Sequence, residues 1–189
     1  MRRHICVFVA LVGMCTCSSF LSAENDESNG KPIEIFTVTD SSNRSSTEMM
    51  SAFREKVASH SNLFSLVTNL DDSTGVVFDA DCKTREKSNE AYVCFYTSYY
   101  AGGVVKTALG SGMYASKSAD DVASYLLALM AKDVAEHWNS TLRSNALTIM
   151  ESCLSAAKFG CSVPVPLTPE FRSRALSLAQ SLHSASPRK

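Results

Sequence analysis

The sequence lacks the short motifs that mark many catalytic, metal and nucleotide sites. It contains no phosphate-binding Walker loop, no His-Glu-x-x-His, no calcium loop and no Gly-x-Ser-x-Gly elbow. A Cys-x-x-Cys pair is also missing, and His60, His137 and His183 are scattered along the chain. Zinc sites need closely spaced cysteines and histidines, and catalytic dithiols need that cysteine spacing, so we expect no metal and no cofactor.

Strong charge of one sign and long apolar runs are missing as well. The formal net charge is -1 and there is no acidic tail, so no overall basic field attracts nucleic acid. The composition, 45% hydrophobic and 20% charged over 189 residues, is that of a globular chain able to bury a core. The apolar run at 5–14 is too short to cross a bilayer comfortably, and no second long apolar run follows it, which predicts no transmembrane segment in the mature chain.

The amino-terminal residues follow the order of a secretory signal peptide. Arg2 and Arg3 precede the apolar run, and small residues followed by an acidic, polar stretch come after it. We place the cleavage site after Ala23, with Ser19 as an alternative, and an uncleaved anchor is the other interpretation. The mature protein is therefore expected to be exported, either to the periplasm or as a secreted protein.

Cys15 and Cys17, at the end of the apolar run, raise the question of a lipid anchor. A lipid-modified cysteine normally follows a small residue, whereas Met14 and Thr16 precede these two. The sequence therefore disfavours a lipoprotein.

Four cysteines remain after removal of the signal peptide, and they predict disulfide bonds. An even number of cysteines in an exported chain indicates pairing, because export places thiols in an oxidising compartment. Cys82, Cys94, Cys153 and Cys161 allow three pairings, and sequence alone does not formally choose among them. Strand geometry favours Cys82–Cys94 and leaves Cys153–Cys161, which would pin the connection between two helices.

The geometric argument rests on two consecutive hairpins. If 76–84 and 91–100 are the arms of the first hairpin and Cys82 faces Cys94, one side of the sheet becomes mostly apolar because side chains alternate along a strand. That side carries Phe78, Ala80, Cys82, Tyr92, Cys94 and Tyr96.

Gly102-Gly103 then turns the chain into a third strand. Pairing Tyr96 with Leu109 across this turn continues the apolar side, whereas a slip of one residue would scatter it. The apolar side gains Val105, Leu109 and Met113, and the opposite side carries Asp79, Asp81, Lys83 and Lys106.

The rest of the chain supplies one more strand pair and several amphipathic helices. Ser45 with Glu48, and Ser118 with Asp121, have the spacing of helix-capping signals. Pro164 and Pro166 predict an extended segment, and Pro169 a helix start. The expected elements are strands at 33–39 and 64–67, the strands above, and helices at 45–60, 119–138, 144–158 and from 168 to about 182.

This order, β-α-β-β-β-β-α followed by a pair of helices, predicts an α+β fold with a mainly antiparallel sheet covered on one face by helices. The expected organisation is a signal peptide at 1–23, a flexible lead-in at 24–31, an α+β domain at 32–140, a carboxy-terminal helical pair packed on it at 141–183, and a disordered tail at 184–189.

Three sets of residues are candidates for function. Asp79 and Asp81 lie on one face of a strand and could serve as an acid/base pair, although such a pair is more often a solvated face. Four tyrosines could stack a ligand or simply belong to the strands: Tyr92, Tyr96, Tyr99 and Tyr100. Asn43 and Asn139 begin sequons that matter only in a source that glycosylates them.

One stretch of the chain resembles a known family. In 46–84 a capped helix leads to Asn62-Leu63-Phe64-Ser65-Leu66-Val67, a polar loop and a hydrophobic strand. This order is similar to the amino-terminal domain of the periplasmic TolB protein and its small envelope relatives. The resemblance implies an envelope-associated interaction domain, and it transfers no functional residue.

The sequence thus leads to three functional hypotheses. The first is an exported, non-catalytic domain that binds a protein or a cell-envelope component. The second is a small secreted hydrolase that uses Asp79 and Asp81. The third is a small-ligand carrier with a tyrosine-lined pocket. An uncovered sheet edge or an exposed apolar patch would favour the first hypothesis.

Overall fold

The structure is a computed structural model that describes residues 31–69, 74–84, 92–102, 105–155 and 165–185, apart from the side chains of Thr74, Ser152, Cys153, Ser155 and Ala185. The chain divides into two compact units, Met1–Lys31 and Pro32–Lys189. The expected signal peptide and all but the last residue of the expected lead-in lie outside the described residues, and the following account concerns the second unit.

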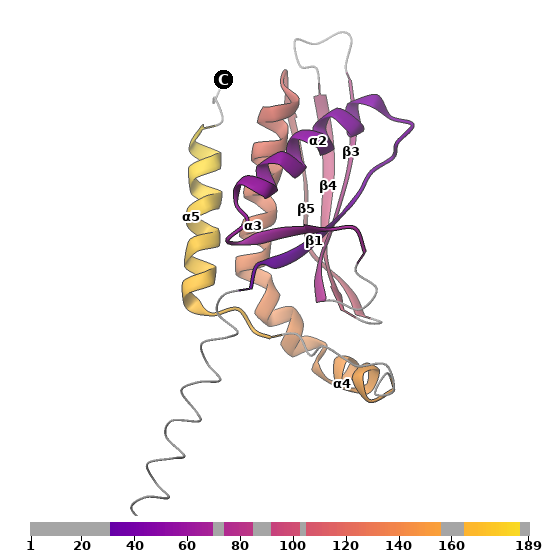
Figure 1. Cartoon of the computed structure of the whole chain (residues 1–189), viewed down its shortest axis with the longest axis vertical. Helices are drawn as coiled ribbons and strands as arrows, with labels where there is room; N and C mark the ends of the chain where they lie inside the picture. Colours follow the sequence, from indigo (N-terminus) through magenta and orange to yellow (C-terminus); the bar gives the residue numbers. More distant parts are fainter. Residues whose placement is uncertain (1–30, 70–73, 85–91, 103–104, 156–164, 186–189) are drawn as a thin grey trace, which may run out of the picture. The chain divides into compact units, whose positions relative to one another are not determined.

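The second unit is built on a five-stranded mixed sheet (Figure 1) with strand order β2-β1-β3-β4-β5. β1 pairs in parallel with β2 and with β3, whereas β3, β4 and β5 form an antiparallel meander. The strands are β1 (Ile33–Val38), β2 (Phe64–Val67), β3 (Thr74–Lys83), β4 (Tyr92–Gly102) and β5 (Val105–Ser116). The predicted α+β class and element order are confirmed, with parallel pairing of β1 as an added feature.

The predicted register of the first hairpin is confirmed. Cys82 pairs with Cys94 and Ala80 with Tyr96. Alternation along β3 and β4 therefore buries one set of side chains and leaves the intervening Asp79 and Asp81 exposed. The buried or half-buried set is the predicted one: Phe78, Ala80, Cys82, Tyr92, Cys94 and Tyr96.

The predicted register of the second hairpin is wrong along its whole length. Next to the turn Gly102 pairs with Val105 and Tyr100 with Thr107, a shift of two residues that keeps the predicted side chains on the inward face. A β-bulge between Ser98 and Tyr99 adds one more residue of shift, so Tyr96 pairs with Gly112 and not with Leu109. The bulge gives β5 an extra residue, so the inward set changes from odd to even positions after Leu109. Val105 and Leu109 are buried as expected, whereas Met113 is 58% exposed on the opposite face.

Within the described ranges, four helices follow or interrupt the strands (Figure 1): α2 (Arg44–Ser59), α3 (Ala119–Ser144), α4 (Ala146–Ser155) and α5 (Pro169–Ala185). α2 packs on β2 and β3, α3 packs on β4 and β5, and the two helices contact each other. α5 packs on the side of α3 that faces away from the sheet. The helices thus cover one face of the sheet, as predicted.

The start of α2 differs from the expected capping box. Asn43, not Ser45, is the cap, and its side chain accepts a hydrogen bond from the Ser46 N–H. Glu48 bonds Arg44 and the Tyr92 hydroxyl instead of reaching back to the cap. Ser118 caps α3 as predicted, through the N–H groups of Asp120 and Asp121.

α3 is longer than expected and ends at Ser144, not near 138. No glycine or proline interrupts its sequence, so the backbone has no reason to leave the helix before Ser144. The domain boundary expected at 140 therefore falls within a helix. Among the described helices, none combines the length and apolar character that crossing a membrane requires.

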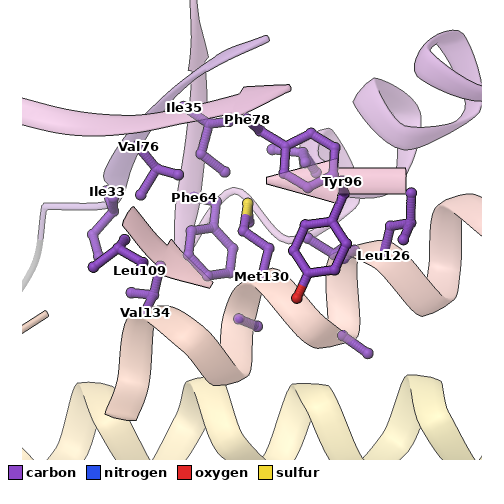
Figure 2. Close-up of a cluster of buried hydrophobic side chains, with 14 of the residues drawn as sticks. Ile33, Ile35, Phe64, Val76, Phe78, Tyr96, Leu109, Leu126, Met130 and Val134 are labelled. Atoms are coloured by element: carbon purple, nitrogen blue, oxygen red, sulfur yellow. The ribbon is translucent and has the colours of Figure 1, made fainter. Parts of the chain in front are cut away.

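The core lies between the sheet and the α2–α3 layer (Figure 2). Phe78 of β3 stacks between Phe53 of α2 and Tyr96 of β4, with ring centroids 4.1 Å and 5.8 Å apart. Stacked aromatic rings add specific packing energy to the area they bury. This row of rings fixes α2 against the centre of the meander.

α4 presents its predicted apolar side to solvent. Leu147, Met150 and Leu154 lie on one side of the helix, as expected, but Leu147 is 76% exposed, and the other two are exposed as well. Ile149, on the other side of α4, is buried. The spacing thus identifies one side of the helix but not the direction in which that side faces.

Candidate functional site

The predicted disulfide joins β3 to β4 close to the end of β3 and the start of β4. The Cys82 and Cys94 sulfurs are 2.04 Å apart, and neither residue is exposed. This bond is the structural staple that the sequence predicted. Cys161 and the side chain of Cys153 lie outside the described residues, so their bond stays a prediction. Among the described residues, no group of three or more His, Cys, Asp or Glu side chains is arranged to hold a metal ion.

Two side chains of the α2 start complete the edge of β3 beside this bond. β1 ends opposite Asp79, which leaves the backbone of Cys82 without a β1 partner. The Cys82 N–H donates to Ser46 Oγ at 2.9 Å, and Asn43 Nδ2 donates to the Cys82 carbonyl at 2.7 Å. Ser46 is fully buried, and these bonds satisfy it. The side chains of Asn43 and Ser46 thus make the hydrogen bonds to Cys82 that a longer β1 would otherwise make.

The candidate aspartates lie on the face of the sheet opposite the helices, where both are exposed. Asp81 Oδ1 accepts hydrogen bonds from Asn43 Nδ2 at 3.2 Å and from Ser46 Oγ at 3.3 Å. Asp81 therefore helps to hold the first turn of α2, a structural task that the hydrolase hypothesis did not include.

The four candidate tyrosines do not gather around one site. Tyr100 packs edge-on against Trp138, and Tyr92 donates to Glu48 Oε2 at 2.7 Å. Tyr99 points to the opposite face of the sheet, where Lys106 Nζ lies 4.4 Å from its ring centroid. Tyr96 enters the core. Their roles in strand packing and in local polar contacts account for all four positions.

A partly buried carboxylate that the sequence reading missed links α3 to the sheet. Asp133 Oδ2 accepts hydrogen bonds from the Tyr96 hydroxyl at 2.9 Å and from Ser98 Oγ at 3.1 Å. In Figure 2 the Tyr96 hydroxyl points toward α3. Asp133 stands three residues after Met130 and seven after Leu126, so helical periodicity could have placed it near the inward side of α3.

Burial and these neighbours change two pKa values. Desolvation raises the pKa of Asp133 above its ordinary value, and the hydrogen bonds from Tyr96 and Ser98 partly oppose that rise. Desolvation, followed by the nearby Asp133 charge, raises the pKa of Tyr96 so that its hydroxyl remains a donor. The cluster therefore acts as a polar link between two layers of the fold.

Two glycines of β5 make room for this cluster. A Cβ atom at Gly110 would overlap the Asp133 carboxylate, and one at Gly112 would lie 2.9 Å from the Tyr96 ring. Both glycines follow the bulge and therefore point inward. The bulge thus places Gly110 next to the Asp133 carboxylate and Gly112 next to the Tyr96 ring.

The outward face of the meander carries an apolar pair. Phe95 and Met113 stand directly opposite each other on β4 and β5 and are 55% and 58% exposed. Asp81 is the neighbour of Phe95 on β3, and Lys83 and Lys106 lie on the same face. No helix within the described residues packs on this face, which we call the open face.

The sequon asparagines are both engaged in hydrogen bonds. Asn139 Nδ2 donates to the Leu167 carbonyl at 2.9 Å, and its Oδ1 accepts from the Leu167 N–H at 2.7 Å. This pair of bonds ties the segment before α5 to α3. Asn43 bonds Cys82 and Asp81, as described above. A glycan on either amide nitrogen would compete with these contacts.

Comparison with known proteins adds no assignment: no protein-family model, no curated protein and no solved structure matches this chain.

Proposed function

We propose that the protein is an exported, non-catalytic domain that binds another protein or a cell-envelope component through the open face. The observation that carries the proposal is the opposed and exposed pair of Phe95 and Met113. Covering a side chain of this kind contributes about 1.5–3 kcal/mol relative to leaving it exposed. Large apolar side chains that are grouped on a surface, and not scattered singly, mark interaction sites.

The groups around this pair favour a protein as the ligand. Asp79 and Asp81 lie on the same face as Phe95, together with Lys83 and Lys106. An apolar centre with a charged rim of both signs is the arrangement found in protein–protein interfaces. Because the two carboxylates balance the two lysines, this face has no net positive charge to attract an anionic lipid surface.

Two features support export. The order of charged, apolar and small residues at the amino terminus is typical of a signal peptide. The Cys82–Cys94 disulfide is typical of proteins that fold in an oxidising compartment. The TolB-like order of elements in 46–84 agrees with an envelope location and adds nothing about chemistry.

Photo-crosslinking in the native host tests the proposal. A photoreactive phenylalanine analogue at Phe95 is expected to trap a partner that mass spectrometry identifies. The same analogue at Lys132, an exposed position of α3, is the control and is expected to trap none. The partner should then bind the purified protein and lose affinity at least tenfold for the Phe95→Ser/Met113→Ser variant. Equal trapping at both positions, or unchanged affinity of the double variant, would contradict the proposal.

A further inference from the structure

The two edges of the sheet differ in how well they resist pairing with another strand. The β2 edge has only four residues. β5 is the other edge, has twelve residues, and pairs with β4 alone among the described strands. Proteins usually protect long edges with charge, proline or bulges, because free backbone groups attract other strands. An unprotected stretch therefore calls for a physical explanation.

The protection of β5 covers only its first half. Lys106 and the bulge at Leu109 lie in the first part of the strand, and Lys117 follows its end. The segment between them, Gly110–Ser116, contains neither a charged residue nor a proline. This segment is free of the usual protecting features, although it is long enough to form a ladder.

The ladder itself shows which backbone groups of this segment point outward. The Cys82 N–H and carbonyl bond α2, so they point away from β4, and Cys82–Cys94 is a non-hydrogen-bonded pair of the β3–β4 ladder. The backbone groups of Cys94 then point toward Tyr114 in β5. By alternation, the backbone N–H and carbonyl groups that point away from β4 belong to Ser111, Met113 and Ala115.

These three residues are self-complementary. If a second copy of the chain pairs antiparallel with Met113 opposite the same residue, Ser111 stands opposite Ala115 of the other copy. In each of the three pairs, the backbone N–H and carbonyl groups of both residues then point toward the other copy. Each pair can therefore exchange two hydrogen bonds. No like charges meet, because Gly110–Ser116 has no charge. The bulge and the strand end limit other registers.

The same register joins the two open faces. Met113 pairs with Phe95 on β4, so the pairing would place four large apolar side chains side by side across the two central hairpins. The two-fold axis is perpendicular to the sheet, and α3 of each copy stays on the other face. Among the described elements, α5 makes its extensive contacts with α3 and not with β5.

We propose that the protein forms a symmetric dimer in which Gly110–Ser116 of two copies pair antiparallel about Met113, giving one continuous ten-stranded sheet. The pairing uses backbone groups of the edge and does not depend on the function proposed above. One such contact consumes the β5 edge of both copies and leaves only the short β2 edges, so association closes at two.

Two measurements on the oxidised, mature protein test the dimer. Sedimentation equilibrium is expected to give twice the chain mass for the wild type and for Ser111→Thr, which keeps the N–H. Ser111→Pro removes an outward N–H without removing a bond to β4 and is expected to give a single-chain mass. A monomeric wild type, or a dimeric Ser111→Pro, would overturn the proposal.

Crosslinking remains decisive if the proline variant fails to fold. In the proposed pair, the two residues at 113 have Cα atoms about 5.5 Å apart. The two residues at 108 are offset by ten positions along the strands and lie about 34 Å apart. A short bismaleimide should therefore join Met113→Cys into covalent dimers and form none with Ala108→Cys. Equal crosslinking of both variants would refute this register.

Discussion

The Tyr96 hydroxyl donates a 2.9 Å hydrogen bond to Oδ2 of Asp133 and thereby joins the centre of the sheet to the middle of α3. A carboxylate in this position is only partly desolvated, yet its pKa lies above the ordinary value. Because the sequence places few other polar groups between the two layers, this bond gives the docking of α3 a specific position along the strands. Its chemistry also leads to the first two predictions.

Stability should depend on pH through Asp133. A raised folded-state pKa means that the folded chain keeps a proton over a range in which the unfolded chain has lost it. The stabilisation is therefore complete below the ordinary pKa of the carboxyl and is lost as pH rises through the raised value. As pH rises from about 4 toward neutrality, we therefore expect the wild type to lose more stability than Asp133→Asn, which has no carboxyl to titrate.

Urea unfolding across that range measures the difference. Glu48, whose pKa the Tyr92 hydrogen bond lowers, acts in the opposite direction, but it is common to both proteins. His137 also acts on Asp133, so the comparison is repeated in a His137→Gln background. A stability difference that does not change with pH would contradict the prediction.

The space above Gly110 should couple to Asp133. Gly110→Ala places a methyl group where the carboxylate lies, and we expect a loss of about 1–3 kcal/mol in the free energy of unfolding. In an Asp133→Ala background the clash is absent, so the same change should cost less. Ser111→Ala, one residue away and on the open face, is the matched control and should change stability by less than about 0.5 kcal/mol. Additive effects of the two substitutions would show that the groups do not share this space.

The Cys82–Cys94 bond should contribute to stability chiefly by restricting the unfolded chain. For a loop of this size, the chain-entropy relation gives about 2–3 kcal/mol, and we expect Cys82→Ala/Cys94→Ala to lose about that amount. Peptide mapping without reduction should show this bond together with the predicted Cys153–Cys161 bond. Free thiols at Cys82 and Cys94 in the native protein would contradict the structure.

Asn139 should hold the segment before α5 in place. Asn139→Ala removes both bonds to Leu167, and loss of two partly buried hydrogen bonds is expected to cost about 1–3 kcal/mol. Hydrogen exchange should become faster in 165–185 and stay unchanged in β3. Thr141→Val is a useful control because it removes the sequon while keeping Asn139. If the chain is made in a glycosylating host, we expect no glycan at Asn139 in the folded protein.

The sequence predicted those parts of the fold that depend on local alternation. Phe78, Cys82 and Cys94 follow period two between clear turn signals, so both the hairpin and its disulfide could be derived. Leu109 marks where this reasoning ends, because nothing in the order of residues announces an inserted bulge. The bulge places Gly110 and Gly112 next to the Asp133 carboxylate and the Tyr96 ring, which leave no space for a side chain. This contact forms only in the folded chain and is not visible in the order of residues.

The candidate sites were harder to predict for the same reason. The tyrosines share a strand but divide between its two faces, and Asp81 meets Asn43 only because β1 ends early. Asp133 could have been noticed as a charge beside an apolar helical stripe. Its partners Tyr96 and Ser98 are more than thirty residues away, so the cluster could not be assembled from spacing.

The completion of the β3 edge by Asn43 and Ser46 also limits how this protein can vary. β1 and the first turn of α2 contact the same edge of β3 one after the other. The pairing with β1 ends at Asp79 of β3, and the contacts with α2 begin at Cys82. Two residues added to the end of β1 would claim the backbone positions that the helix now holds. Insertions at the β1–α2 junction should therefore be poorly tolerated, although the junction is a surface loop. In a library of length variants at this junction, few lengths other than the native one should fold.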